Sequence, residues 1–240
     1  MHCGLLSGVC IALAFFGVQR ASAVGGQSQT ATIEGRVTLE GNPPPPTVVT
    51  QDGGFQQALY VDRSGGLRYA VVFLPDARAG GATPVAAARM NQRNFIFEPQ
   101  VLAVRSGQTV RFTSEDPANH NVRADDSNPS NTFNINTAPG SAEPDTQRFA
   151  ATRPERPLEL SCDIHPWMTA WIYVFDHAQF AVTTADGSFR IDNVPVGRHR
   201  IAVRQPSGGL ARDVTIEVRP GATARLDVRF ASSEVRMHAR

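Results

Sequence analysis

The sequence predicts an all-β protein made of two β-sandwiches. Val, Ile, Phe and Thr alternate with polar residues over many short stretches, which is typical of strands with one buried face. The chain of 240 residues contains 20 Gly and 17 Pro, and these separate the stretches as turns. No stretch shows a sustained helical period. A chain of this length can bury one large core or two small ones.

Residues 1–23 are typical of a secretory signal peptide. The apolar run at residues 5–18 is too short to span a bilayer, and Ala21, Ser22 and Ala23 form a small-residue cleavage pattern. No Arg or Lys precedes the run, which departs from the usual leader. We therefore expect a periplasmic or secreted protein, cleaved near Ala23, with no membrane span in the mature chain.

Cleavage would leave Cys162 as the only thiol, because Cys3 and Cys10 lie in the leader. A single Cys cannot form an internal disulfide, so Cys162 is either a buried, inert residue or a ligand. With Arg20 removed, 22 Arg face 22 acidic residues, and the chain has no Lys. This balance gives no support for binding to nucleic acid or to an anionic membrane.

The N-terminal part of the mature chain, residues 31–80, begins with a clear strand pattern. Ile33, Val37 and Leu39 point to one side, and charged residues point to the other. Gly41 and Asn42, followed by four prolines, end this strand in a turn. A continuous apolar strand is expected at residues 67–74.

A different pattern covers residues 88–177. Paired apolar strands are predicted on both sides of the turn at Ser106 and Gly107, with Phe95 and Phe97 in the first of them. Residues 125–144 are polar and rich in Asn, Ser and Pro, so we expect a long surface loop. Another apolar strand follows at residues 170–175.

Four side chains in this region form a candidate metal site. Cys162, His165 and Met168 have the spacing C-x-x-H-x-x-M, and His120 lies about forty residues upstream. Zinc sites use Cys and His but rarely Met, whereas two His, one Cys and a weak axial Met are typical of type 1 copper. The alternative is a buried Cys, a core Met and two incidental His.

Residues 90–175 resemble the cupredoxin family, and within it the amicyanin and plastocyanin group, including the forms associated with methylamine utilisation. The likeness lies in the strand run F-x-F-x-P-x-x-L-x-V-x-x-G-x-x-V-x-F and in the H-P-aromatic-M sequence at His165, Pro166, Trp167 and Met168. It implies a Greek-key sandwich that binds one type 1 copper ion, with His120, Cys162 and His165 as equatorial ligands and Met168 as the axial ligand.

The same resemblance implies roles for residues around the ligands. Asn121 would tie the His120 segment to the ligand loop, and the carbonyl of Asn119 would be a distant axial neighbour. His165 would present its outer edge to solvent for electron entry. Asp163 and Ile164 depart from the amicyanin loop, which puts the choice of partner in doubt.

Residues 178–230 resemble a carboxypeptidase regulatory-like, transthyretin-type sandwich. The likeness lies in the run T-x-A-D-G-x-F-x-I-x-N-V-P-x-G-x-H-x-I-x-V at residues 183–203. The usual first strand of that family, I-x-G-x-V followed by G-x-P, is missing there but is present at residues 33–43. We therefore favour a cupredoxin inserted into a split sandwich. The alternative is three consecutive units, with residues 31–80 as a cupredoxin extension. A loose tail is expected at residues 231–240.

The sequence favours single-electron transfer between redox partners, of which at least one is a protein still to be identified. A periplasmic copper carrier or sensor is the first alternative, with the same ligands but exchangeable metal. A carbohydrate- or protein-interaction module with a structural copper site is the second. No Ser-His-Asp order, phosphate loop, paired-carboxylate motif or second set of clustered His stands out, so we do not expect an enzyme.

Overall fold

The computed structural model describes Met1 and residues 30–45, 47–48, 55–56, 59–140, 145–153 and 156–237. The predicted leader from residue 2 onward and the last three residues of the predicted tail lie outside this part. Within the described residues, no helix has the length and apolar character that crossing a bilayer requires.

The described part of the chain is built from strands and contains no α-helix, which confirms the all-β prediction. Two 3₁₀ turns, η1 (Pro129–Asn131) and η2 (Ser232–Glu234), accompany them. The strands are β1 (Thr30–Glu40), β2 (Thr47–Val48), β3 (Phe55–Gln56), β4 (Val71–Phe73), β5 (Ala88–Arg93), β6 (Ile96–Glu98), β7 (Val101–Arg105), β8 (Thr109–Ser114), β9 (His120–Ala124), β10 (Phe133–Thr137), β11 (Asp145–Arg148), β12 (Leu158–Ser161), β13 (Thr169–Phe175), β14 (Phe180–Val182), β15 (Ser188–Pro195), β16 (Gly197–Gln205), β17 (Leu210–Val218), β18 (Thr223–Arg225) and β19 (Val228–Ala231).

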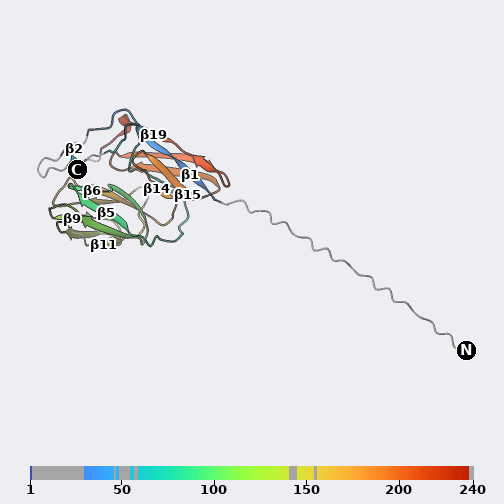
Figure 1. Ribbon diagram of the computed structural model, residues 1–240, viewed down its shortest axis with the longest axis horizontal. Helices are drawn as coiled ribbons and strands as arrows, with labels where there is room; N and C mark the ends of the chain where they lie inside the picture. Colours follow the sequence, from blue (N-terminus) through green and yellow to red (C-terminus); the bar gives the residue numbers. More distant parts are fainter. Residues whose placement is uncertain are drawn as a thin grey trace.

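The middle of the chain forms a sandwich of two sheets, which we call the central sandwich (Figure 1). One sheet has the order β10-β9-β12-β13-β7 and the other β11-β8-β5-β6. Alternating apolar residues of both sheets, including Phe112, Leu160 and Ile172, pack into one core. Cys162 and Met168 belong to the same core.

A second sandwich combines the two ends of the described chain, and we call it the flanking sandwich. β1 pairs antiparallel with β15 and parallel with β18 and β19. The facing sheet has the order β14-β4-β16-β17. The predicted apolar face of β1, Ile33, Val37 and Leu39, is buried in the core of this sandwich. If the central sandwich is inserted between β4 and β14, β1 must pair with strands that follow the insertion, as it does here.

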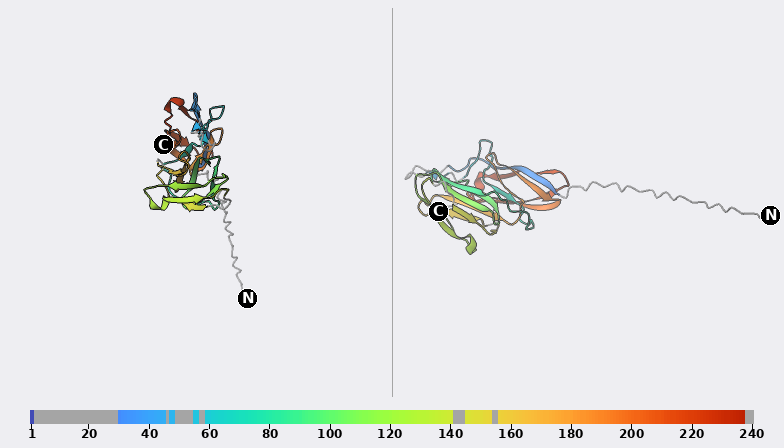
Figure 2. Two further views of the ribbon diagram at one scale, coloured as in Figure 1. Left: turned by 90° about the vertical axis from the view of Figure 1, so that its left-hand side faces the viewer. Right: turned by 60° about the horizontal axis from the view of Figure 1, so that its bottom comes forward.

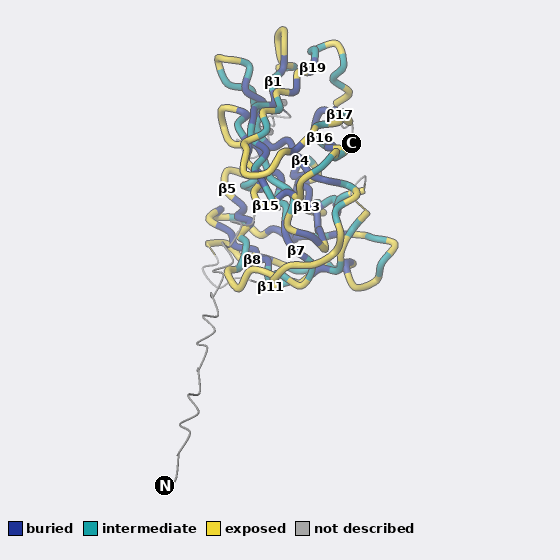
Figure 3. The backbone as a smooth tube through the Cα atoms, turned by 90° about the vertical axis from the view of Figure 1, so that its right-hand side faces the viewer, coloured by how far each residue is buried: buried dark blue, intermediate teal, exposed yellow. Residues whose placement is uncertain are grey.

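The two sandwiches lie side by side and share a third apolar cluster (Figure 2). Ala170, Ile172 and Val174 of β13 face the central core, whereas Trp171, Tyr173 and Phe175 face the flanking sandwich. All seven residues of β13 are therefore buried. Dark blue, buried backbone runs through the region where β4, β13 and β16 meet (Figure 3).

Two sequence predictions about polar segments need correction. The polar stretch at residues 125–144 is not a simple loop, because it contains η1 and β10, which pairs with β9. The predicted loose tail instead carries η2, and the amide of Arg236 donates a hydrogen bond to the Gly208 carbonyl at 2.7 Å. In both places backbone hydrogen bonds, which composition does not reveal, order a polar segment.

The burial of β1 leads to a stability prediction. Ile33 is fully buried in the flanking core, so Ile33→Ala is expected to lower the free energy of unfolding by about 2–5 kcal/mol. Urea unfolding followed by far-ultraviolet circular dichroism measures the loss, and limited proteolysis should cut first after residue 180. Glu40→Ala, at the exposed end of the same strand, is the control. Earlier cleavage within residues 90–175 would contradict the pairing of β1 with the C-terminal strands.

Candidate metal centre

Strand pairing brings the predicted ligands together. β12 pairs antiparallel with β9, with Leu160 opposite Ala124 and Ser161 opposite Arg123. His120 begins β9, and Cys162 follows the last residue of β12, so both lie at the same end of this strand pair. His165 lies in the short loop between Cys162 and β13. Two stretches about forty residues apart thus form one site.

Three ligand atoms converge in a buried cluster. The Nδ1 atoms of His120 and His165 are 3.0 Å apart, and the Cys162 Sγ lies 4.0 Å and 3.8 Å from them, respectively. All three side chains are buried, and His120 is fully so. Within the described residues, this is the group of His, Cys and carboxylate side chains that could hold a metal ion.

The cluster has the dimensions of a metal site. A first-row metal has bonds of about 2.05 Å to imidazole nitrogen and about 2.3 Å to thiolate sulfur. With those lengths, the measured separations correspond to N–metal–S angles of about 120–135° and an N–metal–N angle of about 95°. These are the angles of a trigonal N, N, S arrangement, so the three residues fit a copper ion. The same donors also accept zinc.

Met168 is placed close to this cluster by the ligand loop. Its side chain is fully buried in the central core that also contains Cys162. Its amide donates a hydrogen bond to the His165 carbonyl at 2.9 Å, which closes the loop into a tight turn. The loop therefore carries one thiolate, one imidazole and one thioether into the same buried region.

Asp116 orients His120, although no sequence motif singles it out. The Asp116 carboxylate lies 2.9 Å from Nε2 of His120, and both side chains are buried. An Nε2–H that donates to this carboxylate leaves the lone pair of Nδ1 directed at Cys162 and His165. The sequence does carry a signal for this contact, because Asp116 and His120 are four positions apart, on either side of Pro117.

The same carboxylate fixes an unusual turn next to the cluster. Asp116 accepts hydrogen bonds from the amides of Asn94 (2.6 Å) and Phe95 (3.0 Å), which connect β5 and β6. Both turn residues have positive φ, 56° and 59°, although neither is Gly. Phe95 was predicted to lie in a strand, and this is wrong because the carboxylate holds it in the turn instead.

Aromatic rings surround the two imidazoles. The Phe95 ring is edge-on to both, with centroid distances of 5.5 Å to His120 and 5.0 Å to His165. The Trp167 ring lies 5.2 Å from that of His165, and its Nε1 donates to the Phe95 carbonyl at 3.2 Å. These contacts keep water away from the ligand atoms and lower the local dielectric.

A polar network locks the ligand loop to the neighbouring strands. Asn121 accepts a hydrogen bond from the Asp163 amide at 2.7 Å and donates one to the Asp163 carboxylate at 2.8 Å. Asn134 of β10 and Arg123 of β9 also donate to that carboxylate. Desolvation raises the pKa of Asp163, but the hydrogen bonds from Asn121 and Arg123 outweigh it and hold the pKa below its ordinary value.

The remaining predicted residues lie around the ligand loop. Ile164 and Pro166 are exposed on either side of His165, which is itself 7% exposed. His165 is therefore nearer the surface than the fully buried His120. No contact of the Asn119 carbonyl tests its expected axial position, which stays a prediction. The other described His residues, His177 and His199, hydrogen-bond to backbone atoms outside this cluster.

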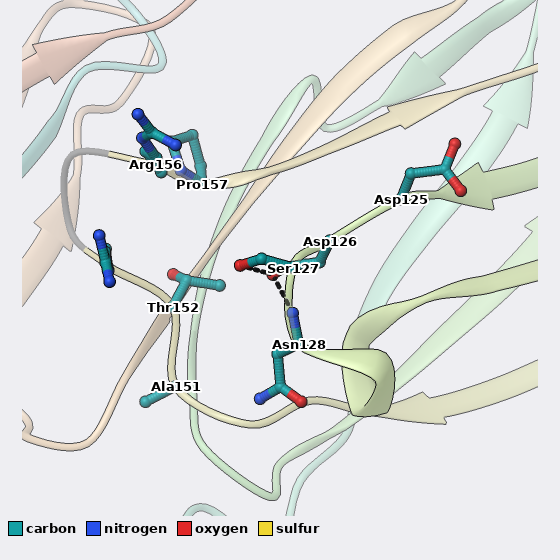
Figure 4. Close-up of a pocket in the computed structure, with 9 residues that line it drawn as sticks. Asp125, Asp126, Ser127, Asn128, Ala151, Thr152, Arg156 and Pro157 are labelled. Atoms are coloured by element: carbon teal, nitrogen blue, oxygen red, sulfur yellow. Dashed lines mark hydrogen bonds between the residues drawn. The ribbon is translucent and has the colours of Figure 1, made fainter.

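A surface hollow of about 530 Å³ lies elsewhere on the central sandwich, and none of the candidate metal ligands lines it (Figure 4). It lies between the segment after β9 and the segment before β12. Asp126 at its edge accepts hydrogen bonds from Ser127 and from the amide of Asn128. The Asp126 carboxylate is thus used locally, and among the described residues the converging set of possible metal ligands is the one at His120, Cys162 and His165.

Comparison with known proteins gives a limited likeness. No protein-family model matches the chain, and no curated protein matches it significantly. Among solved structures, a purple cupredoxin from Nitrosopumilus maritimus is 21% identical at a TM-score of 0.31. The match covers 37% of this chain and 99% of the chain of that cupredoxin. Amicyanin from Paracoccus versutus is 15% identical at a TM-score of 0.32, and the match covers 43% of this chain and 97% of the amicyanin chain.

A copper-containing nitrite reductase from Thermus scotoductus is 24% identical at a TM-score of 0.30, covering 42% of this chain and 25% of its own. At these identities and TM-scores the likenesses carry no argument about what this chain binds. That argument rests on the geometry of the cluster. No solved structure named here covers more than half of the chain, so the likeness to a carboxypeptidase regulatory-like sandwich stays a prediction.

Asp116→Asn tests the orientation of His120. The amide can no longer accept from both His120 and the turn amides, so metal affinity is expected to fall about 10–100-fold. Competition with a chromophoric chelator measures the affinity for Cu(I). Asp126→Asn, an equivalent change in the hollow of Figure 4, is the control. Equal affinities in the two variants would show that Asp116 does not position the ligand.

Proposed function

We propose that this chain binds one type 1 copper ion and carries single electrons between redox partners. The observation that carries the proposal is the buried cluster of two imidazole nitrogens and one thiolate sulfur, separated by 3.0–4.0 Å. His120, Cys162 and His165 would be equatorial ligands and Met168 the axial one. The thioether favours copper over zinc, because zinc sites use Cys and His but rarely Met.

The residues around the cluster suit rapid electron transfer. Bound copper would supply a reversible one-electron Cu(II)/Cu(I) couple. Asp116 fixes one imidazole, and the Asn121–Asp163 pair fixes the ligand loop, so the ligands need little rearrangement between oxidation states. Phe95 and Trp167 exclude water, while His165 lies close enough to the surface to pass electrons to a docked partner.

A carrier or sensor would use the same ligands but needs exchangeable metal. The burial of Cys162 and the hydrogen bonds that hold the loop favour tight retention over exchange. We also infer an exported protein, periplasmic or secreted, that acts on an unidentified protein partner and is not an enzyme. The resemblance of residues 90–175 to cupredoxins and the leader sequence support this inference.

The first test of this proposal is optical. Protein loaded with Cu(II) is expected to show an intense visible thiolate-to-copper band and narrow copper hyperfine splitting in electron paramagnetic resonance, because Cys162 is an equatorial ligand. Cys162→Ala should abolish both features. Mass spectrometry of the metal-loaded protein should give one copper per chain. A copper-loaded wild type without colour would contradict the proposal. If the protein retained zinc in preference to copper, zinc would be the metal of this site.

The second test concerns Met168. Met168→Gln is expected to keep the copper and the colour but to shift the reduction potential, because the axial ligand tunes it. Voltammetry of the loaded protein measures the shift. Met90→Gln changes another fully buried methionine of the same core. It is the control for the effect that an added polar group has on the potential. Equal potentials in wild type and Met168→Gln would remove Met168 from the ligand set.

A further inference from the structure

A buried histidine lies at the junction of the two sandwiches. His177 is part of residues 176–179, which we call the connecting segment because they lead from β13 of the central sandwich to β14 of the flanking one. The side chain is 3% exposed and does not belong to the metal cluster. Histidine changes its charge near neutral pH, so a buried histidine at a junction can make the contact between two parts of a protein depend on pH.

Two phenylalanine rings pack around His177. The centroid of the imidazole lies 5.1 Å from that of Phe175 and 6.4 Å from that of Phe180. The two phenylalanine rings stack on each other at 4.6 Å. Phe175 belongs to the apolar cluster that the two sandwiches share, and Phe180 packs against it. The imidazole is thus part of the contact that holds the sandwiches together.

A hydrogen bond to the ring favours its neutral form. The amide of Gln179 donates to Nδ1 of His177 at 3.2 Å. Nδ1 therefore carries a lone pair, and the proton of the neutral ring is on Nε2. A second proton can enter only at Nδ1, where it would face the amide hydrogen of Gln179. The charged ring therefore cannot keep this hydrogen bond.

Burial and a neighbouring arginine oppose a positive charge on His177. Burial lowers the pKa of His177, the charge of Asp176 opposes this effect, and the charge of Arg105 adds to it. Arg105 comes from β7 and is itself buried, whereas Asp176 is exposed, so that solvent screens its charge. From β13 and β14 the imidazole meets the uncharged rings described above. A second positive charge near Arg105 is therefore disfavoured.

The connecting segment also carries hydrogen bonds between the two sandwiches. The carbonyl of Asp176 accepts from Nη2 of Arg105 at 3.0 Å and from the amide of Gly80 at 2.9 Å. The carbonyl of Gln179 accepts from the amide of Leu74 at 3.1 Å. Leu74 and Gly80 lie on the chain that enters the central sandwich after β4. An outward movement of the connecting segment would break these bonds together.

We propose that the connecting segment is an acid-sensitive latch, which holds the two sandwiches together while His177 is neutral and releases them when the imidazole is protonated. The added proton comes from solvent and binds Nδ1. The charged ring then reaches water by leaving the junction, and each sandwich keeps its own core.

The pH range of the latch follows from the direction of the pKa shift. The pKa of His177 in the closed junction lies below its ordinary value of 6.5. The latch is therefore fully closed above about pH 6.5, and its stabilisation is lost as the pH falls from there toward the lower pKa of the closed form. Export of the chain, as proposed above, would expose the latch to the pH of the surroundings.

Hydrogen exchange of the full chain, measured by mass spectrometry and corrected for the intrinsic effect of pH, tests the latch. Between about pH 7.5 and about pH 5, the protection of amides in residues 70–74 and 176–182 is expected to fall about tenfold. Residues 158–162 in the central core should stay protected. His177→Asn should remove the loss, because its Oδ1 can accept from the Gln179 amide but cannot take up a proton.

Two further variants complete the test. His199→Asn changes a half-buried histidine of β16 outside the junction and should behave like wild type. Asp176→Asn removes the exposed charge that opposes the lowering of the His177 pKa. This variant should keep its protection at about pH 7.5 and lose more than wild type at about pH 5, because its closed form takes up a proton less readily.

The outcomes separate the latch from a merely structural role of the histidine. The proposal is overturned if the junction of the wild type keeps its protection at about pH 5, or if His177→Asn loses as much protection as the wild type. It is also overturned if Asp176→Asn loosens the junction equally at both pH values. Because none of these measurements needs bound copper, they are independent of the proposed electron-transfer function.

Discussion

Strand β13 is the constraint on which the rest of the structure depends. It begins one residue after Met168, so its position sets the end of the ligand loop. One face completes the core around Cys162, and the other face binds the flanking sandwich. Burying both faces of one strand adds the stabilisation of two apolar interfaces to a single element. The ligand loop is thus anchored to a strand whose seven residues are all buried.

The ligand cluster could be predicted from the sequence because its parts are local. Cys162, His165 and Met168 lie within one short loop, and the spacing itself brings three donors together. His120 required only the expectation that its strand pairs near Cys162, and the region between Met90 and Phe175 contains no further His. The alternating face of β1 was readable for the same reason, since a period of two depends on neighbouring residues alone.

The residues that support the cluster could not be predicted, because their partners are distant. Asp116 acts on the turn amides of Asn94 and Phe95, more than twenty positions away, and on an imidazole four positions away. Phe95 reads as a strand residue, since an aromatic side chain seldom adopts positive φ without a fixed partner. Trp171 and Tyr173 read only as apolar, and a continuous apolar run does not say what covers its second face.

The two sandwiches are joined at a buried arginine. Arg105, 5% exposed at the end of β7, donates hydrogen bonds from Nη2 to the carbonyls of Gly80 and Gly81 and to that of Asp176. The first two lie on the segment entering the central sandwich and the third on the segment leaving it. A guanidinium cannot lose its charge, so its burial is tolerated only where such acceptors are fixed around it. The same contact therefore ties both connecting segments together, and β13, which ends just before the second of them, holds the ligand loop in place.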